Sequence, residues 1–364
     1  MKAALFSSVP YQGPAGRVMW PVPAAEYAVE VAERSMRGSL EQFELADQVG
    51  FDWVTVAEHH FAPMSMTPNP MVFAGALTQR VRTSKIALLG ADIPILNPIR
   101  VAEEFAMLDT LTGGRIVAGM LRGTTNEYVT YGVNPAESRE RFEEAMELII
   151  RAWTEPQPFG WQGRYYEYRA ISIWPRPVQR PYPPIYISGS SPESGELAAR
   201  NHLHLGFAFT TVPLARDAAR YYREQAHEAG WEPTPDHVLY RLAVHVADTD
   251  EQAMDDLMVG GGGPRISFAT SNRALDDTAA NMGYYGRDTA TQRGRLAAHA
   301  LDERIELGQL LAGGPKQVRQ QIQWIRDELG AGILDLTFAP VGRDKTLHAI
   351  ELFGSEILPW MHEL

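Results

Sequence analysis

The chain has 364 residues, of which 45% are hydrophobic and 21% charged, a composition typical of a folded globular protein. Its 45 acidic and 33 basic residues give a formal net charge of −12, which argues against general binding of nucleic acid or anionic membranes. The absence of cysteine excludes disulfides, thiolate nucleophiles, iron–sulfur clusters and cysteine-ligated zinc. No signal peptide and no membrane-spanning apolar run is evident, so we expect a soluble cytoplasmic protein.

Short apolar runs predict eight strands, and stretches of helical periodicity separate most of them. The strands are expected at residues 3–6, 53–56, 85–89, 116–118, 184–187, 205–208, 239–246 and 333–338. Eight strands that alternate with helices are typical of a (β/α)8 TIM barrel, an α/β fold. A doubly wound open sheet competes, but no glycine-rich dinucleotide fingerprint follows the first strand. We expect a single barrel domain over residues 1–364.

Two segments do not fit the strand–helix repeat and are predicted to be insertions. Residues 155–183 are rich in proline and aromatic residues, which favours an ordered insertion. Residues 260–313 begin Gly-Gly-Gly-Gly-Pro and are rich in Asn, Asp, Thr and Gly. An insertion of that length is commonly a functional lid, and a disordered linker is the alternative.

Glu58, His59 and His60 directly follow the second predicted strand. The carboxyl ends of barrel strands form the active face, so this cluster is a candidate catalytic site. It could serve general acid–base catalysis, bind a metal or form a hydrogen-bonded rim. The two histidines are adjacent rather than one helical turn apart, and no third ligand is evident, so no metal site is expected.

Arg122 follows the fourth predicted strand, between Gly119 and Gly123. The glycines let the backbone approach a ligand closely, and the guanidinium offers a planar fork to a phosphate or carboxylate. Pairing with an acid at the barrel rim is the alternative. Arg139, at the start of a later predicted helix, would make a sharper anion site if it lay near Arg122.

The loop after the fifth predicted strand reads SGSSPESGE at residues 188–196. Ser191 is expected to cap a helix that begins with Pro192 and carries Glu193 in its first turn. The amides at the start of that helix, together with the serine hydroxyls, would form an anion cradle. An ordinary capped helix is the alternative. Three loops on one face therefore offer chemistry suited to a phosphate-bearing cofactor.

These motifs, taken in order, resemble the bacterial luciferase family of flavin-dependent monooxygenases, and the luciferase catalytic subunit in particular. The resemblance covers nearly the whole chain. Beyond Arg122 and the serine-rich loop, its motifs are AEHHF at 57–61, NPIRVAEE at 97–104, LDTLTGGR at 108–115, LAGGP at 311–315, GAG at 330–332 and LFGSEILP at 352–359.

The resemblance implies a barrel that binds reduced FMN, supplied by a separate flavin reductase, at the carboxyl ends of its strands. O2 then adds to the flavin 4a carbon to give a peroxide, and one oxygen atom passes to the substrate. The resemblance makes His59 the catalytic histidine and Glu58 its cofactor-side neighbour, and His60 completes the expected catalytic set. Gly90 and Ala91 fall where the family bends the third strand beneath the isoalloxazine, often through a non-prolyl cis peptide.

The resemblance also implies how the flavin phosphate is bound. The expected contacts are Arg122, Arg139, Gly189, Ser190, Ser191 and Ser194. The luciferase subunit has a glutamate near Ser190, so this chain departs from the pattern in the serine-rich loop. Asp92, just beyond Ala91, has no clear counterpart in the family.

A small apolar organic substrate is expected, with Phe6, Phe61 and Tyr128 as candidate contacts. Packing in the core or the lid is the alternative for each of them. The family usually forms dimers through helices near the early strands, and apolar residues at 72–77 and 102–111 could supply such a homodimer face. Burial of these residues in the core is the alternative. Two other functions stay open. One is hydride transfer with a deazaflavin coenzyme on the same barrel, and the other is the role of a non-catalytic partner subunit.

Overall fold

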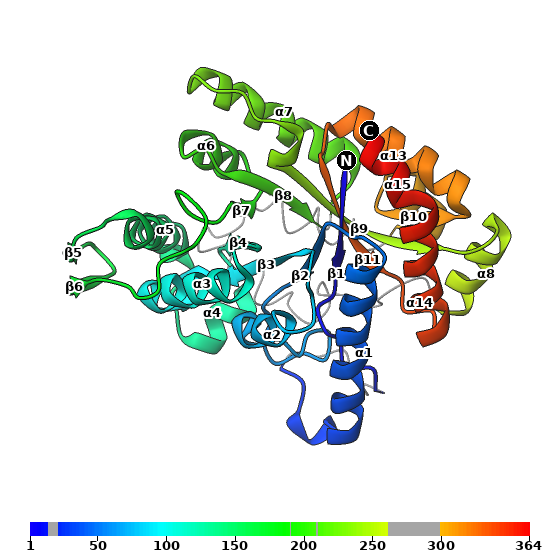
Figure 1. Ribbon diagram of the computed structural model, residues 1–364, viewed down its shortest axis with the longest axis horizontal. Helices are drawn as coiled ribbons and strands as arrows, with labels where there is room; N and C mark the ends of the chain where they lie inside the picture. The colour runs from blue at the N-terminus through cyan, green and yellow to red at the C-terminus, as the bar shows by residue number, and fades with distance from the viewer. Residues whose placement is uncertain (14–20, 190, 209, 261–298) are drawn as a thin grey trace.

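The computed structural model describes residues 1–13, 21–189, 191–208, 210–260 and 299–364 (Figure 1). Within these ranges, parallel strands close into an eight-stranded barrel, in which β9 pairs with both β8 and β11. The barrel strands are β1 (Lys2–Phe6), β2 (Trp53–Val56), β3 (Lys85–Asp92), β4 (Ile116–Leu121), β7 (Ile185–Ser188), β8 (His204–Ala208), β9 (Val238–Val246) and β11 (Ile333–Phe338). The predicted (β/α)8 TIM barrel is confirmed, and each predicted strand overlaps one of these.

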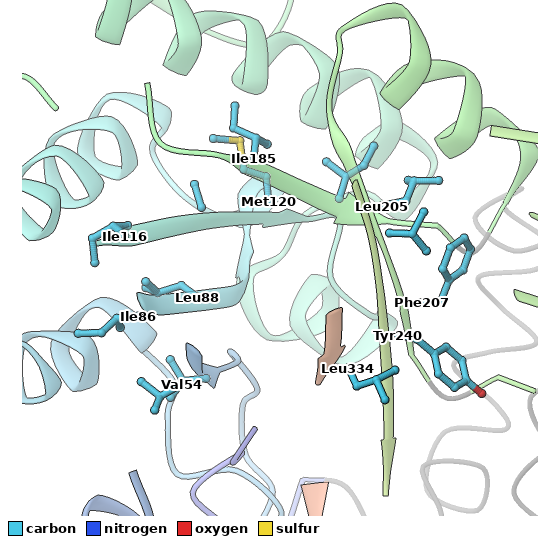
Figure 2. Close-up of a cluster of buried hydrophobic side chains, with 14 of the residues drawn as sticks. Val54, Ile86, Leu88, Ile116, Met120, Ile185, Leu205, Phe207, Tyr240 and Leu334 are labelled. Carbon is cyan, nitrogen blue, oxygen red and sulfur yellow. The ribbon is translucent and has the colours of Figure 1, made fainter. Parts of the chain in front are cut away.

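Side chains alternate along each strand between the barrel interior and the surrounding helix layer. In β3, Ala87 and Leu89 face the interior, whereas Ile86 and Leu88 join the outer core. Figure 2 shows outer-core side chains contributed by seven strands, including Val54, Met120, Ile185, Leu205, Tyr240 and Leu334. Because both faces are buried, the strands read as continuous apolar runs, which is why sequence analysis could find them.

Helices form the outer layer and link successive strands (Figure 1). They are α1 (Val29–Gln48), α2 (Pro70–Leu77), α3 (Pro98–Thr112), α4 (Thr125–Tyr131), α5 (Ser138–Thr154), α6 (Pro192–Arg200), α7 (Val212–Glu228), α8 (Asp250–Val259), α13 (Pro315–Leu329), α14 (Arg343–Leu352) and α15 (Leu358–Glu363). In the described ranges, none of the helices is both long and apolar enough to cross a bilayer.

Residues 155–183 contain an antiparallel hairpin, β5 (Phe159–Gln162) and β6 (Glu167–Ile171), which lies at the edge of the molecule beyond α5 (Figure 1). The Glu144 carboxylate on α5 accepts the backbone N–H groups of residues 164–166 at 3.0–3.1 Å. Asp109 on α3 accepts those of residues 178–179 at 2.7 and 2.9 Å. The hairpin strands were not predicted, because they are short and mostly exposed, so they lack a continuous apolar run.

The second predicted insertion, 260–313, is described from residue 299 onward. This part contains α12 (Leu301–Glu306) and a further strand, β10 (Leu310–Gly313). β10 pairs in parallel with the second half of β9, whereas β8 pairs with the first half. Sequence analysis missed β10, because a four-residue apolar run next to glycines is equally compatible with a loop. Residues 261–298, the main part of the predicted lid, lie outside the described residues.

Candidate active site

The predicted catalytic and cofactor-binding residues lie at the carboxyl ends of four strands. Glu58, His59 and His60 follow β2, Gly90 and Ala91 belong to the end of β3, Arg122 follows β4, and the serine-rich loop follows β7. These strands are neighbours in the order β2-β3-β4-β7 and run in parallel, so their carboxyl ends share one rim of the barrel. Arg139 reaches this rim from the first turn of α5.

Glu58 is buried and links the end of β2 to the end of β3. Its backbone N–H donates to the carbonyl of Gly90 at 3.1 Å, and its Oε2 accepts the backbone N–H of Asp92 at 3.0 Å. Its Oε1 lies 3.0 Å from Nε2 of His60. His60 is only 3% exposed, and its ring packs edge-on against Tyr131 with centroids 5.0 Å apart. Glu58 therefore fixes the position of both His60 and the β3 end.

His59 is the more exposed of the two imidazoles, with 19% of its side chain accessible. Its Nδ1 lies 3.2 Å from Oε1 of Glu127, which stands in the first turn of α4. The other Glu127 oxygen accepts the backbone N–H of Thr124 at 2.8 Å and also its hydroxyl, which completes a capping box. The start of α4 thus holds Glu127 so that one oxygen faces His59.

Glu127 is a site residue that sequence analysis missed. Burial alone would raise the pKa of its carboxyl, but the hydrogen bond and charge of His59 and the hydrogen bond from Thr124 outweigh burial and hold the pKa below its ordinary value. A carboxylate beside an imidazole orients the ring and selects its tautomer. The Thr-x-x-Glu spacing after a strand was the available signal, because a capping box there places its glutamate at the barrel rim.

A third carboxyl, that of Asp92, is buried near both glutamates. The residue is 3% exposed, and among the described residues its Oδ2 has no hydrogen-bond partner. Burial raises the pKa of Asp92 well above its ordinary value, and the charges of Glu127 and Glu58 raise it further. Within the part of the chain that the structure describes, no three or more His, Asp or Glu side chains are arranged to hold a metal ion.

Gly90 and Ala91 lie in an irregular stretch at the end of β3. The register between β3 and β4 shifts between Leu88 and Ala91. A Cβ atom on Gly90 would lie 2.9 Å from the backbone oxygen of Gly119, so a side chain does not fit there. The expected non-prolyl cis peptide is present, and it is the bond between Leu89 and Gly90.

The serine-rich loop begins α6 as predicted. The Ser191 Oγ caps the helix by accepting the backbone N–H of Ser194 at 3.4 Å, and it lies 3.1 Å from the Ser194 Oγ. A Cβ atom on Gly189 would lie 2.6 Å from the ring of Phe207, so the loop needs glycine at this position. Ser190 lies outside the described residues. The structure therefore places two hydroxyls beside the N-terminal amides of α6.

Arg139 approaches Glu193, in the first turn of α6, and the charge of Arg122 acts on the same carboxyl. The Nη2 atom of Arg139 lies 3.7 Å from Oε2 of Glu193. A backbone hydrogen bond and the Ser191 hydroxyl hold the pKa of Glu193 below its ordinary value, and the charges of Arg139 and Arg122 lower it further. The structure thus brings together the two guanidiniums that sequence analysis singled out. With the serine hydroxyls and the helix start, they form a donor set suited to a phosphate.

The three predicted substrate contacts lie in different surroundings. Phe61 is 56% exposed and has a left-handed backbone conformation, with φ of 56°. Phe6 is buried at the end of β1, where the Arg241 guanidinium lies 3.6 Å from its ring centroid. Tyr128 is 1% exposed, and its hydroxyl donates to the backbone carbonyl of Arg122. Phe61 therefore presents the largest accessible surface, whereas Tyr128 supports the loop that carries Arg122.

A buried ion pair inside the barrel was not predicted. Arg241 on β9 places Nε 2.6 Å from Oδ2 of Asp335 on β11, and Oδ1 of Asp335 accepts the Thr55 hydroxyl at 2.6 Å. Arg241 also donates to the carbonyl of Leu89 at 3.2 Å, on the amino side of the cis bond. The pair therefore connects three strands to the irregular end of β3. Single polar residues in otherwise apolar strands gave no signal that they would meet.

A closed parallel barrel with polar and charged side chains gathered at the carboxyl ends of its strands has the architecture of (β/α)8 enzymes. A model of the luciferase-like monooxygenase family matches residues 18–331, so the chain belongs to that family. It is 24% identical over 330 residues to the alkanal monooxygenase alpha chain of Photorhabdus luminescens, covering 88% of this chain and 90% of that protein.

Other curated relatives match over a shorter length. The chain is 29% identical over 234 residues to 4-hydroxyprotoasukamycin monooxygenase of Streptomyces nodosus subsp. asukaensis, covering 62% of this chain and 63% of the relative. It is 27% identical over 177 residues to the oxygenase component of flavin-dependent trigonelline monooxygenase of Acinetobacter baylyi. That match covers 46% of this chain and 49% of the relative. The chain also matches two uncharacterised proteins of Sinorhizobium fredii. These matches cover 46% of one protein and 47% of the other, about half of each protein's length.

Solved structures share the fold. The oxygenating constituent of 3,6-diketocamphane monooxygenase from Pseudomonas putida, solved with FMN, superposes with a TM-score of 0.76 at 20% identity and covers 99% of this chain and 98% of that chain. An F420-dependent secondary alcohol dehydrogenase superposes with a TM-score of 0.67 at 19% identity, covering 98% of each chain. The same barrel therefore occurs in a monooxygenase and in an F420-dependent dehydrogenase.

Proposed function

We propose that this protein is a flavin-dependent monooxygenase that uses reduced FMN and O2 to oxygenate a small apolar organic substrate. The observation that carries the proposal is the His59–Glu127 pair, at the same barrel rim as the two arginines whose charges act on Glu193. Curated relatives that are named monooxygenases, one of them flavin-dependent, support it. The neighbour solved with FMN is consistent with this choice of cofactor.

The donor set around α6 fits the phosphate of FMN. Arg122 and Arg139 would supply charge-assisted hydrogen bonds, and Ser191 and Ser194 would add hydroxyl donors beside the helix amides. Gly189 and Ser190 belong to the same loop in this proposal. Gly90 and Ala91 end β3 at the same rim, and in this proposal they lie along the flavin ring.

When bound, reduced FMN supplies the electrons that activate O2. The protein's part is to control a proton and to exclude water. Because Glu127 engages Nδ1 of His59, we assign proton exchange with the reacting ligand to Nε2, on the far side of the ring. Glu58 and His60 are buried, so their part is to hold His59 and the end of β3 in place.

The proposal also includes partners. A separate flavin reductase would supply the reduced FMN, in line with the relative named as an oxygenase component. The exposed ring of Phe61 would contact the substrate, and the proposal keeps Phe6 and Tyr128 as the other two contacts. We propose a homodimer through α2 and α3, because Val72, Met107 and Leu111 are exposed apolar side chains on these helices.

The test supplies reduced FMN and O2 together with a panel of aldehydes, ketones and terpenoids, and follows oxygenated product by mass spectrometry. Product formation with reduced FMN is expected. His59→Ala should keep its affinity for FMN, lose product formation and release more hydrogen peroxide. Turnover with reduced F420 in place of reduced FMN would contradict the proposal and favour hydride transfer. A chain that binds neither coenzyme would fit the role of a non-catalytic subunit.

A further inference from the structure

Three buried carboxyl groups lie with two imidazoles where β2, β3 and β4 end. Glu127 pairs with His59, and Glu58 pairs with His60, so each imidazole has its own carboxylate. Asp92 is the third carboxyl, and its Oδ2 has no hydrogen-bond partner among the described residues. The proposed function employs both pairs but gives Asp92 no role. A buried carboxyl at this position requires a separate explanation.

The surroundings of Asp92 disfavour a third negative charge. Its backbone N–H binds Oε2 of Glu58 at 3.0 Å, and the Gly123 backbone lies so close that a Cβ atom there would be 3.0 Å from the Asp92 Cγ. Tyr131 lies near the same cluster, since burial and then the charges of Glu58 and Glu127 raise the pKa of its hydroxyl. Neighbouring carboxyls in a buried site do not all ionise together, and one of them keeps its proton.

We propose that Asp92 carries the proton of this three-carboxyl cluster. The choice falls on Asp92 because Glu127 accepts hydrogen bonds from Thr124 and faces His59, and Glu58 accepts the backbone N–H of Asp92 and faces His60. Burial and the two glutamates raise the pKa of Asp92 in the same direction. With Asp92 neutral, the cluster holds two negative charges, one for each imidazole. Ionised Asp92 would add a charge that acts on both.

The proposal rests on the proposed function for what the cluster serves, but not for the protonation state of Asp92. That state is tested on the protein alone by infrared spectroscopy at pH 7. We expect a C=O stretching band of a protonated carboxylic acid that Asp92→Asn removes. Asp109→Asn is the matched control, because Asp109 is also buried but accepts two backbone N–H groups and the Gln179 amide. An acid band that survives in Asp92→Asn would overturn the proposal.

If Asp92→Asn does not fold, the band is assigned in the unchanged protein by its shift on ¹³C labelling of aspartate. Absence of any aspartic acid band at pH 7 would then overturn the proposal. Where the variant folds, NMR titration of the His59 and His60 rings provides a second readout. A neutral Asp92 predicts titration curves that coincide between Asp92→Asn and the unchanged protein. An ionised Asp92 predicts a displacement of about one pH unit, because the variant then loses a nearby charge.

Activity gives the third readout and separates the two proposals. Asparagine resembles a neutral carboxylic acid in size and polarity, so Asp92→Asn should keep kcat within about twofold and leave the shape of its pH profile unchanged. A changed pH profile with a folded variant would show that Asp92 acts as an anion. If reduced FMN yields no product at all, the proposed function fails, whereas the infrared and NMR results still decide the protonation of Asp92.

Discussion

His59 and Glu127 meet at the barrel rim from two elements that are far apart in the sequence, with 3.2 Å between Nδ1 and Oε1. His59 follows β2, whereas Glu127 belongs to α4 after β4, and β3 runs between these two strands in the sheet. The pair thus spans the end of β3, where Gly90, Ala91 and Asp92 lie. Any change in Glu127 should therefore be felt at the imidazole that the proposed chemistry requires.

Replacing Glu127 with glutamine separates charge from helix capping. Glutamine can complete a capping box, so Glu127→Gln should keep α4 intact while it removes the negative charge beside His59. We expect product formation to slow by roughly 10- to 100-fold, because an imidazole without its carboxylate loses orientation and proton affinity. FMN titration should show affinity within about twofold of the unchanged protein. Glu328→Gln, at an exposed ion pair with Arg216, is the control. Full turnover in Glu127→Gln would show that the role of Glu127 is limited to capping α4.

The arginine pair can be tested with two flavins that differ by one phosphate. Arg122→Ala should weaken FMN binding by roughly 10- to 100-fold, since a charge-assisted hydrogen bond contributes about 1.5–3 kcal/mol. Riboflavin lacks the phosphate, so its affinity should stay the same. Arg139→Ala should give the same pattern, and Arg220→Ala, at an exposed position on α7, should affect neither ligand. Calorimetry with both flavins measures the difference. An equal loss of FMN and riboflavin binding would place the arginines elsewhere than at the phosphate.

Much of the fold was predictable because its strands are buried on both faces. The run at 85–89 marked β3, and the Ser191–Pro192 pair marked the start of α6, since each depends on local chemistry. The rim residues could be grouped in advance because parallel strands bring their carboxyl ends together. The cis peptide before Gly90 was expected through family resemblance rather than through any local signal.

The parts that escaped prediction depend on contacts between distant residues. Glu127 reads as a helix-start glutamate, and the sequence does not show that it faces His59. Arg241 and Asp335 are single charges in apolar strands, 94 residues apart, and only barrel closure brings them together. β10 forms a strand because β9 extends beyond β8, and β10 pairs with that extension. Pairing of this kind depends on strand length and register, which local patterns do not specify.

The Arg241–Asp335 pair should be costly to break. Asp335→Ala leaves a buried guanidinium without its partner, and we expect the free energy of unfolding to fall by about 3–5 kcal/mol. The double variant Arg241→Met, Asp335→Leu removes both charges and should recover most of that loss. Glu328→Ala breaks the exposed pair with Arg216 and should cost less than about 1 kcal/mol. Urea unfolding measures all three. A loss below about 1 kcal/mol for Asp335→Ala would mean that water reaches the barrel interior.

His204 should make the protein sensitive to acid. Its ring is stacked between Tyr186 and His237, with centroids 4.5 and 4.3 Å away, and Nδ1 lies 3.1 Å from the carbonyl oxygen of Ile185. Burial, followed by the charge of His237, lowers the pKa of His204 to about 4 in the folded protein. A histidine in the unfolded chain titrates near 6.5, so between these values the unfolded state binds the extra proton.

Stability should therefore fall as the pH drops from about 7 toward 4 and change no further through this group at lower pH. The two pKa values give a contribution of about 2 kcal/mol at pH 5. His204→Gln keeps a side-chain N–H for the Ile185 carbonyl but does not titrate, so between pH 7 and pH 5 it should lose about 2 kcal/mol less than the unchanged protein. His348→Gln, at an exposed ion pair with Asp248, is the matched control. Urea unfolding at both pH values measures the free energy of unfolding of each protein. Equal losses in all three proteins would show that His204 takes up its proton in the folded protein without loss of stability.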